Sequence, residues 1–232
     1  MGLLDSYASI LKALEHAATN NNVRVIIKFI DTGEIEKGKK KIEDELDEID
    51  GLIVPGGFGV RGSEGKIACI KYTRENNLPF LGLCFGFQMA VIEFARNICG
   101  LKESNSTELD SKCKEPVISI LPEQKEIEGL GGNMRLGGKD IEIKEGTKAF
   151  GLFKSSKIRR RFRHRYEVDP KYIEILEKNG MVFSGKAPKH PIMQILELPD
   201  KKFFMATQAH PEFASRPLNP EPMFNAFIKA IL

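Results

Sequence analysis

The sequence contains few of the features that mark secreted, metal-binding or membrane proteins. Its four cysteines, among 232 residues, form no Cys-x-x-Cys pair, which argues against a zinc site and against a secreted disulfide framework. No apolar run approaches the roughly 18 residues of a membrane span. The N-terminus also lacks the basic-then-apolar pattern of a signal peptide. We therefore expect a cytoplasmic protein without a membrane segment or a bound metal.

The sequence also lacks a marked excess of either charge. Its 35 basic and 32 acidic residues give a net charge of +3, which is too small to predict nucleic acid as the main partner. The one strongly basic run extends from Arg159 to Arg165, where Phe162 and His164 interrupt the arginines. RNA binding, a carboxylate clamp and a docking surface for an acidic partner all remain open for this run.

The first half of the chain alternates strand-like and helical patterns. Runs of β-branched or apolar residues are separated by segments with apolar residues at helical spacing. This order predicts an α/β fold, with a mostly parallel central sheet and helices on both faces. We expect strands at 23–30, 52–54 and 78–83, a helix at 63–75, and a first helix around Ile10 to Ala18 that Asp5 or Ser6 caps.

The second half is less regular and predicts a smaller antiparallel part. We expect a single domain over residues 1–232, because a chain of this length can bury about 70% of its unfolded surface in one core. The final segment has a one-sided apolar face that should pack on the sheet. The expected strands are 116–121, 141–143, 181–184, 192–198 and 203–208, and the expected final helix is about 220–232.

Cys84 lies between two glycines in the sequence Gly82-Leu83-Cys84-Phe85-Gly86. A strand-like run precedes it and a helical pattern follows, which is the arrangement of a nucleophile elbow with cysteine in place of serine. The glycines permit the sharp turn, while a helix N-terminus and a nearby imidazolium favour the reactive thiolate. Cys84 is therefore the predicted nucleophile, and the other three cysteines are interpreted as small buried apolar residues.

His210-Pro211-Glu212 follows the strand-like run 203–208, which places the imidazole at the carboxyl end of a strand. Alternate residues of an extended segment share a side, so Glu212 can fix the orientation of the ring. Ligand sites in α/β sheets lie at the carboxyl ends of strands, where Gly56-Gly57 and Cys84 are also expected. These residues together predict a thiol acyl-transfer site.

Two glycine-rich stretches fit nucleotide-binding patterns, but their surroundings argue against that use. Gly57 to Gly62 has G-x-G-x-x-G spacing, yet the next strand ends at Cys84 rather than at an acidic residue for a ribose. We interpret Gly57 as a source of one main-chain donor for an oxyanion, with the Phe85 N–H as the other. Gly33 to Lys40 lacks the Ser or Thr that binds magnesium, and we interpret it as a charged loop and helix start.

Six stretches carry a resemblance to a known family: 55–62, 82–88, 105–108, 134–137, 163–168 and 210–213. On these stretches the sequence resembles the class I (triad) glutamine amidotransferases, and within them the amidotransferase domain of CTP synthases. The elbow and the His-Pro-Glu triplet are shared by all triad amidotransferases. Met134 to Gly137 and Arg163 to Val168 favour the CTP synthase type. The resemblance implies a flavodoxin-like α/β fold.

The resemblance also implies a role for each matching residue. Cys84 would attack the side-chain amide of L-glutamine through a thioester, His210 would act as general base and then acid, and Glu212 would orient His210. The implied substrate site comprises the oxyanion donors Gly57 and Phe85, the neighbouring Gly86, Phe87 and Gln88, Glu108 for the α-ammonium group, and Arg165 for the α-carboxylate.

In the family, the ammonia released passes to a synthetase domain that uses ATP to aminate UTP. The resemblance therefore implies that domain as a partner, in cis or in trans, and assigns ATP, magnesium and UTP to it. We expect it to be absent from this chain, because no Gly-x-x-x-x-Gly-Lys-Ser/Thr loop occurs, and we expect no cofactor here. The family domain also opens with a strand that this sequence lacks, which would leave neighbouring strands without a pairing partner.

Two other functions remain open at this point. A γ-glutamyl peptide hydrolase would use the same cysteine and histidine. A regulatory or assembly module would keep the fold but hardly turn over glutamine without a synthetase partner. Comparing the turnover of glutamine with that of γ-glutamyl peptides separates the first alternative, and covalent labelling of Cys84 without steady-state ammonia release identifies the second.

Overall fold

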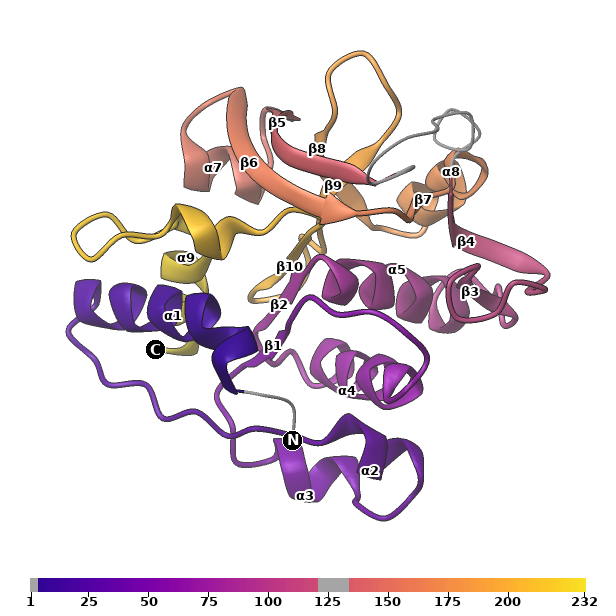
Figure 1. Cartoon of the computed structure of the whole chain (residues 1–232), viewed down its shortest axis with the longest axis horizontal. Helices are drawn as coiled ribbons and strands as arrows, with labels where there is room; N and C mark the ends of the chain where they lie inside the picture. Colours follow the sequence, from indigo (N-terminus) through magenta and orange to yellow (C-terminus); the bar gives the residue numbers. More distant parts are fainter. Residues whose placement is uncertain (1–3, 121–133) are drawn as a thin grey trace.

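A seven-stranded sheet curls through the middle of the molecule (Figure 1). The computed structural model describes residues 4–120 and 134–232. Three neighbouring strands are parallel, and the other four continue the sheet in antiparallel pairs. In spatial order the strands are β1 (Leu52–Val54), β2 (Phe80–Leu83), β10 (Phe204–Thr207), β9 (Met193–Glu197), β8 (Val182–Lys186), β5 (Arg135–Ile143) and β6 (Lys157–His164).

A second, three-stranded sheet lies at the side of the larger one (Figure 1). It consists of β3 (Ser104–Ser106), β4 (Glu115–Ser119) and β7 (Glu167–Val168). β3 and β4 are parallel, and β4 and β7 are antiparallel. Only Arg165 and Tyr166 separate the end of β6 from the start of β7, so this short segment joins the two sheets.

Helices cover both faces of the larger sheet. They are η1 (Leu4–Tyr7), α1 (Ala8–Asn20), α2 (Thr32–Glu36), α3 (Ile42–Leu46), α4 (Ser63–Glu75), α5 (Phe85–Asn97), α7 (Lys148–Phe153), α8 (Pro170–Lys178), η2 (Pro211–Ala214) and α9 (Pro222–Ile231). Within the described part of the chain, no helix has the length and apolar character needed to cross a bilayer.

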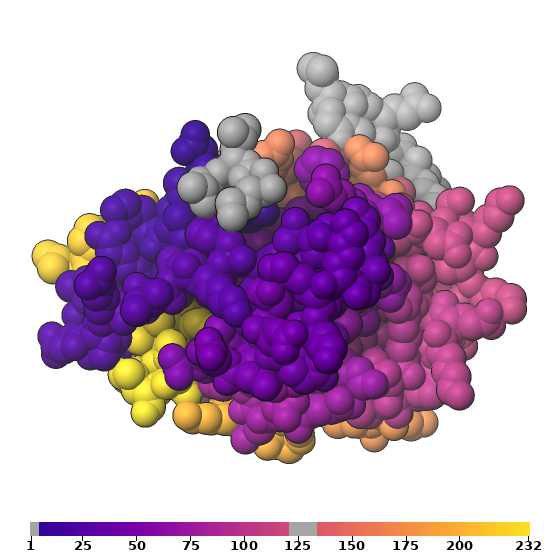
Figure 2. Space-filling model, turned by 90° about the horizontal axis from the view of Figure 1, so that it is seen from below, coloured from indigo at the N-terminus to yellow at the C-terminus, as the bar shows by residue number. Residues whose placement is uncertain are grey.

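Successive residues of β2 face opposite layers, as strand geometry requires. Phe80 lies in the apolar cluster that includes residues of α4 and α5, whereas Leu81 lies in the cluster that includes residues of α1 and α9. The view from below shows the N-terminal segments beside the C-terminal ones, which agrees with the packing of α1 against α9 (Figure 2). The predicted α/β fold with helices on both faces is therefore confirmed.

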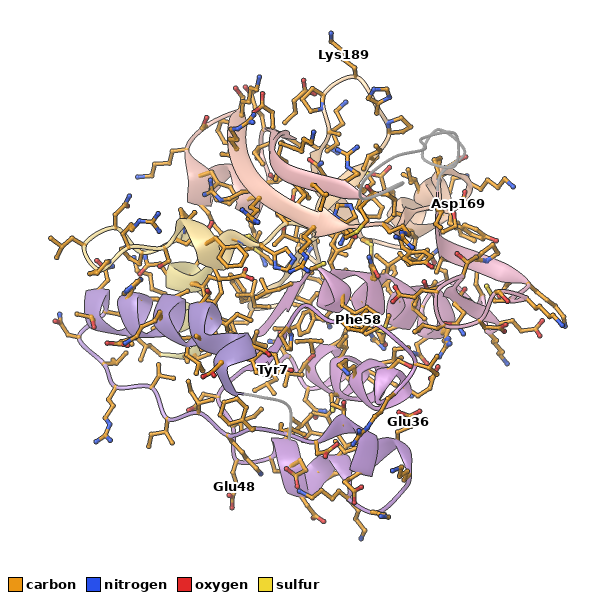
Figure 3. All side chains as sticks on the ribbon, in the orientation of Figure 1. Tyr7, Glu36, Glu48, Phe58, Asp169 and Lys189 are labelled. Carbon is orange, nitrogen blue, oxygen red and sulfur yellow. The ribbon has the colours of Figure 1, made fainter. Side chains whose placement is uncertain are left out.

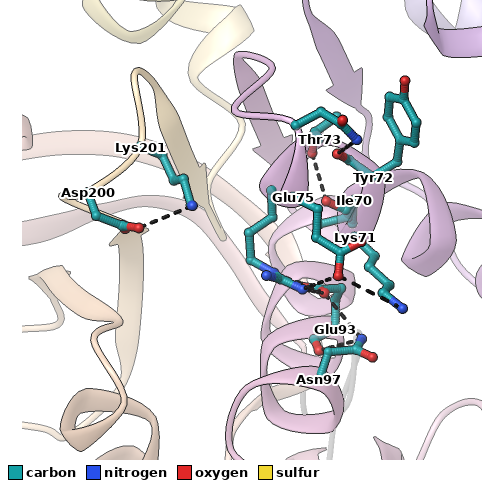
Figure 4. Close-up of polar contacts among 11 residues, drawn as sticks. Ile70, Lys71, Tyr72, Thr73, Glu75, Glu93, Asn97, Asp200 and Lys201 are labelled. Carbon is teal, nitrogen blue, oxygen red and sulfur yellow. Dashed lines mark hydrogen bonds and ion pairs between the residues drawn. The ribbon is translucent and has the colours of Figure 1, made fainter.

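A buried ion pair ties α4 to α5. The Arg74 guanidinium donates to the Glu93 carboxylate, with Nη2 at 2.8 Å from Oε1 and Nε at 3.0 Å from Oε2. Asn97, one turn further along α5, also donates to Glu93 (Figure 4). Glu93 is fully buried, so the paired fork of Arg74 is what makes its charge tolerable in the core.

The predicted cap of the first helix is wrong. Neither Asp5 nor Ser6 caps α1, because the 3₁₀ turn η1 precedes the helix and Tyr7 occupies the N-cap position without a side-chain hydrogen bond. The final helix begins later than expected, at Pro222, because Glu221 caps it by accepting hydrogen bonds from the Met223 and Phe224 N–H groups. Helix α4 matches the expected range.

The predicted strand at 23–30 does not form. This segment is extended, but it pairs with no strand in the described part of the chain, and β1 pairs only with β2 there. Ile26 is 89% exposed. The β-branched composition favours an extended backbone, but a strand also requires a hydrogen-bonded neighbour, and no described residue provides one.

Candidate active site

Cys84 lies at a sharp turn between β2 and α5. Its φ of +51° is in a region that residues with a side chain rarely adopt, and it forms the N-cap of α5. The backbone is held in this conformation because the Cys84 N–H donates to the Thr207 carbonyl at 2.7 Å. The predicted nucleophile elbow is therefore present, with the sulfur at a helix N-terminus.

The two glycines beside Cys84 are required by close backbone contacts. A Cβ atom on Gly86 would lie 2.1 Å from the Val54 carbonyl oxygen, and one on Gly82 would lie 2.8 Å from the Ala206 Cβ and 2.9 Å from the carbonyl of Gly86. Each of these distances is too short for a Cβ atom, so only glycine fits at the two positions. The turn thus brings β1 and α5 into direct backbone contact, which is why this pattern needs glycine on both sides of the nucleophile.

His210 lies just after β10 and is held in place by a backbone hydrogen bond to β6. Its N–H donates to the Arg161 carbonyl of β6 at 2.8 Å, and η2 begins directly after it. The His210 Nδ1 lies 2.8 Å from Glu212 Oε1. Glu212 is buried, and its Oε2 has no hydrogen-bond partner among the described residues. The carboxylate therefore acts mainly on the imidazole and fixes its orientation.

The surroundings of His210 favour its protonated form. Burial lowers its pKa, but the hydrogen-bonding interactions with Cys84 and with Glu212 outweigh this effect and raise the pKa to about 10. The ring therefore carries a positive charge at neutral pH. An imidazolium beside a sulfur favours the thiolate, which is the nucleophilic form. Cys84, His210 and Glu212 thus form a chain of interacting side chains, as the sequence predicted.

The other cysteines have a different environment. Burial raises the pKa of Cys69 to about 12 and that of Cys99 to about 11. Burial also raises the pKa of Cys113. None of the three has a basic partner comparable to His210, so the structure distinguishes Cys84 from them chemically. No group of three or more His, Cys, Asp or Glu side chains suited to a metal occurs in the described part of the chain.

The two predicted oxyanion donors lie beside one another. A Cβ atom on Gly57 would lie 3.8 Å from the Phe85 ring, and one on Gly56 would lie 3.0 Å from His210 Cε1 and 3.6 Å from the Cys84 Cβ. Phe85 is the first residue of α5, so its N–H has no carbonyl partner within the helix. The loop after β1 thus packs against the triad, with the exposed Phe58 next in the chain (Figure 3).

Two further predicted residues, Glu108 and Arg165, follow strands β3 and β6. Glu108 Oε1 accepts a hydrogen bond from the Gly59 N–H at 3.0 Å, which ties the loop after β1 to the segment after β3. Burial raises the pKa of Tyr166, and the nearby Glu108 carboxylate raises it further while Arg165 lowers it. Glu108 and Arg165 therefore lie close to the same tyrosine, and Arg165 is exposed.

Gly86, Phe87 and Gln88 have different surroundings. Gly86 forms the backbone contact with β1 described above, and Phe87 is fully buried in the core cluster. Gln88 is also buried, and its amide donates to the Tyr166 carbonyl at 3.1 Å and to Gln208 Oε1 at 3.2 Å. Its Oε1 has no partner among the described residues. Of these three residues, Gln88 is thus the one whose side chain has a polar atom without a hydrogen-bond partner among the described residues.

Gln208 is a site residue that the sequence interpretation missed. Its side chain is fully buried, and Nε2 donates to Cys84 Sγ at 3.6 Å while Oε1 accepts from Gln88. It is thus an amide donor to the nucleophilic sulfur, supported from behind by a second amide. A signal was available in the sequence, because Gln208 precedes His210 by two residues at the end of β10 and alternate residues of an extended segment share a side.

The stretch Gly33 to Lys40 does not form a phosphate-binding loop. Helix α2 begins at Thr32, and the Asp31 carboxylate caps it by accepting a hydrogen bond from the Gly33 N–H. A carboxylate thus occupies the position at the helix N-terminus where a phosphate would bind. The interpretation of this stretch as a charged loop and helix start agrees with the structure.

Comparisons with known proteins agree with this geometry. Residues 2–230 match the family described as "Glutamine amidotransferase class-I". The CTP synthase of Pyrococcus abyssi is 53% identical over 229 residues, which cover 98% of this chain and 42% of that protein. The CTP synthase of Methanocaldococcus jannaschii is 50% identical over 236 residues, with 99% and 43% covered. The chain thus spans less than half the length of these curated relatives.

Among solved structures, the glutaminase domain of Trypanosoma brucei CTPS with bound acivicin superposes with a TM-score of 0.91 at 35% sequence identity. The alignment covers 98% of this chain and 88% of that one. A glutamine amidotransferase from Thermotoga maritima has a TM-score of 0.53 at 16% identity, with 94% and 89% covered, which is a similarity of fold alone.

Proposed function

The chain belongs to the class I glutamine amidotransferase family, as an amidotransferase domain of the CTP synthase type, and on this premise we propose that it hydrolyses the side-chain amide of L-glutamine. The observation that carries the proposal is the position of His210. It contacts Glu212 on one side and interacts with Cys84 on the other, and these two interactions together outweigh burial and raise its pKa to about 10. A nucleophile, a proton carrier and an orienting carboxylate are therefore all in place.

The reaction proceeds in two acyl-transfer steps. The Cys84 thiolate attacks the amide carbon, and the carbonyl electrons move onto the oxygen. When this oxyanion collapses, the C–N bond breaks, His210 gives its proton to the leaving nitrogen, and ammonia and a γ-glutamyl thioester are formed. His210 then removes a proton from water, which attacks the thioester. Breakage of the C–S bond releases glutamate and restores the thiolate and the imidazolium.

Main-chain donors stabilise the oxyanion in both steps. The N–H groups of Gly57 and Phe85 are assigned to this role, because the two residues adjoin each other beside the nucleophile. Losing one such donor in comparable enzymes costs about 3 kcal/mol of transition-state stabilisation.

The ends of glutamine are recognised by opposite charges. Glu108 is assigned to the α-ammonium group and Arg165 to the α-carboxylate, and their common neighbour Tyr166 supports assigning both to the same end of the substrate. Gln88 is assigned to the substrate site, and its buried Oε1, which has no hydrogen-bond partner among the described residues, supports this assignment. Gly86 and Phe87 act through the shape of the elbow, since neither presents a polar side chain.

The ammonia is destined for a synthetase domain that aminates UTP to CTP, attached in cis or in trans. This proposal rests on the relatives, which are CTP synthases of more than twice the length of this chain. ATP, magnesium and UTP are assigned to that domain, and no cofactor is assigned to this one.

The test compares ammonia release from L-glutamine by the wild-type chain and by Cys84→Ala. We expect release by the wild type and none above background for the variant. Equal release by both proteins would exclude Cys84 as the nucleophile. Faster turnover of γ-glutamyl peptides than of glutamine would instead favour the peptide hydrolase. Stoichiometric labelling of Cys84 by a thiol-reactive glutamine analogue, without ammonia release, would favour the regulatory or assembly module.

A further inference from the structure

The basic run from Arg159 to Arg165 divides into residues with different roles. Arg159 forms an ion pair with Asp140 at 3.0 Å, and Arg160 forms one with the buried Glu221 at 3.1 Å. These two pairs tie β6 to β5 and to the start of α9. Arg161 and Arg163 form no ion pair with any residue that the structure describes, although both lie on β6. Their charges are therefore available to a ligand.

Both of these arginines line a cavity of about 390 Å³ beside His210, which we call the arginine cavity. It lies between the start of α1, where Tyr7 is found, and the His-Pro-Glu turn (Figure 3). None of the residues assigned to glutamine outside the triad lines it. Its walls are Ser6, Tyr7, Ile10, Gly56, Arg161, Arg163, His210, Glu212 and Phe213.

The polar groups of the arginine cavity are mostly donors. Arg161 and Arg163 are separated by one residue on a strand, so their Cα atoms are about 7 Å apart and their guanidinium groups can converge on one ligand. The Arg161 guanidinium lies over the Phe213 ring, 5.6 Å from its centroid, which restricts its position. Ser6 and Tyr7, which both carry a hydroxyl group, line the same cavity.

The start of α1 lies at the arginine cavity, and the dipole of this 13-residue helix favours negative charge at its N-terminal end. The one carboxylate in the lining is Glu212, which is already bound to His210. The cavity thus combines two guanidinium groups with two residues that carry hydroxyl groups, and its lining contains no second carboxylate to balance the positive charge.

We propose that the arginine cavity binds a phosphate-bearing small anion. A volume of about 390 Å³ favours a small ligand over an acidic protein segment, and paired guanidinium forks match the geometry of phosphate oxygens. Because His210 and Glu212 form one wall, an anion bound there places negative charge next to the imidazolium of the triad. Occupancy of the cavity is thus coupled to the charge state of the catalytic histidine.

The test measures the binding of inorganic pyrophosphate by isothermal titration calorimetry, at constant ionic strength, to the wild-type chain and to the double variant Arg161→Gln/Arg163→Gln. We expect at least a tenfold weaker binding by the double variant. Lys157→Gln/Arg159→Gln is the matched control, since it also removes two positive charges from the same strand but outside the cavity, and it should bind within about twofold of the wild type. Far-UV circular dichroism establishes that each variant is folded.

Arginine modification gives a second measurement that does not depend on the variants. Pyrophosphate should protect Arg161 and Arg163 from phenylglyoxal, as read by mass spectrometry, and should leave Arg165 and Arg216 unprotected. Equal affinity of the wild type and the double variant, or equal protection of all four arginines, would overturn the proposal. Displacement of pyrophosphate by an acidic peptide at equimolar concentration would overturn it in favour of an acidic protein partner. These measurements do not require glutaminase activity, so they stand or fall separately from the proposed function.

Discussion

At the scale of single residues, Gln208 provides the clearest test of how the thiolate is held. It donates to Cys84 Sγ and is itself supported by Gln88. A hydrogen bond to a charged group contributes about 1.5–3 kcal/mol, which corresponds to roughly a 10- to 100-fold effect. We predict that Gln208→Leu lowers kcat for glutamine by this factor and also slows alkylation of Cys84 by iodoacetamide at neutral pH. An unchanged alkylation rate would show that Gln208 acts only on packing.

Arg165 is expected to act on binding rather than on the chemical step. Its side chain is exposed, and both Arg165 and Glu108 lie near Tyr166. A carboxylate clamp contributes equally in the ground state and the transition state, so Arg165→Ala should raise KM for glutamine with little change in kcat. Arg216→Ala, which removes an arginine outside both sites, is the control. A collapse of kcat at unchanged KM would contradict the assignment.

The raised pKa of His210 predicts a pH-dependent contribution to stability. The folded-state pKa of about 10 lies above the ordinary value of about 6.5 for an unfolded histidine. The protonated ring therefore stabilises the fold fully below about pH 6.5, and this contribution is lost as the pH rises to about 10. We predict that the difference in Tm between the wild type and His210→Gln shrinks across this window. A constant difference would show that the ring is neutral throughout.

The residue-level predictions from sequence succeeded where a motif specified both a residue and its local structure. The glycines around Cys84 imply a tight turn, and the structure shows why no other residue fits there. Gln208 was not found because no motif includes it, and its role depends on two strands, β2 and β10, that are distant in sequence and adjacent in the sheet.

At the scale of elements, the elbow depends on the approach of α5 to β1. A Cβ atom at Gly86 would lie 2.1 Å from the Val54 carbonyl oxygen, a backbone atom that cannot move without shifting the whole strand. We predict that Gly86→Ala destabilises the fold by about 3 kcal/mol, at the upper end of overpacking effects, and abolishes glutamine hydrolysis. Thermal unfolding and the ammonia assay measure the two effects.

Gly151 offers the control for this substitution. It lies in α7, has no positive φ, and a Cβ atom there would meet nothing within 4 Å. Gly151→Ala should therefore leave Tm unchanged or raise it, by up to about 1 kcal/mol of added stability. Equal losses of Tm for both variants would show that the close contact at Gly86 is not what constrains the elbow.

Element prediction failed where the determining interaction was not local. The strand β6 carries most of the basic run, and its four arginines gave no apolar alternation on which to predict a strand. The structure explains the pattern by what each arginine contacts. Two of the arginines form ion pairs, with Asp140 and Glu221, and two more line the arginine cavity. The antiparallel part of the sheet was predicted in outline, whereas β3, β7 and the joining segment at Arg165 were not.

At the scale of the whole molecule, segment 23–30 has no strand partner in the described part of the chain. The backbone N–H groups of residues 24–30 form no backbone hydrogen bonds with the described part of the chain, and the side chains of Ile26, Ile27 and Phe29 are exposed. An extended, apolar and unpaired segment is a template for pairing with another chain. The site residues lie elsewhere in the sheet, so activity and self-association are separable properties of this fold.

We predict concentration-dependent self-association of the chain, measured by sedimentation velocity, and its suppression by Ile26→Lys/Phe29→Lys. The charges would oppose strand pairing at little cost to the core, because both side chains already face solvent. Leu218→Lys/Leu232→Lys is the control, since it replaces two apolar residues that are also exposed but lie outside the segment, and it should leave association unchanged. If both double variants reduced association equally, general surface hydrophobicity rather than the unpaired segment would be the cause. A wild-type chain that remained monomeric at all concentrations would show that the extended segment shields its own backbone groups.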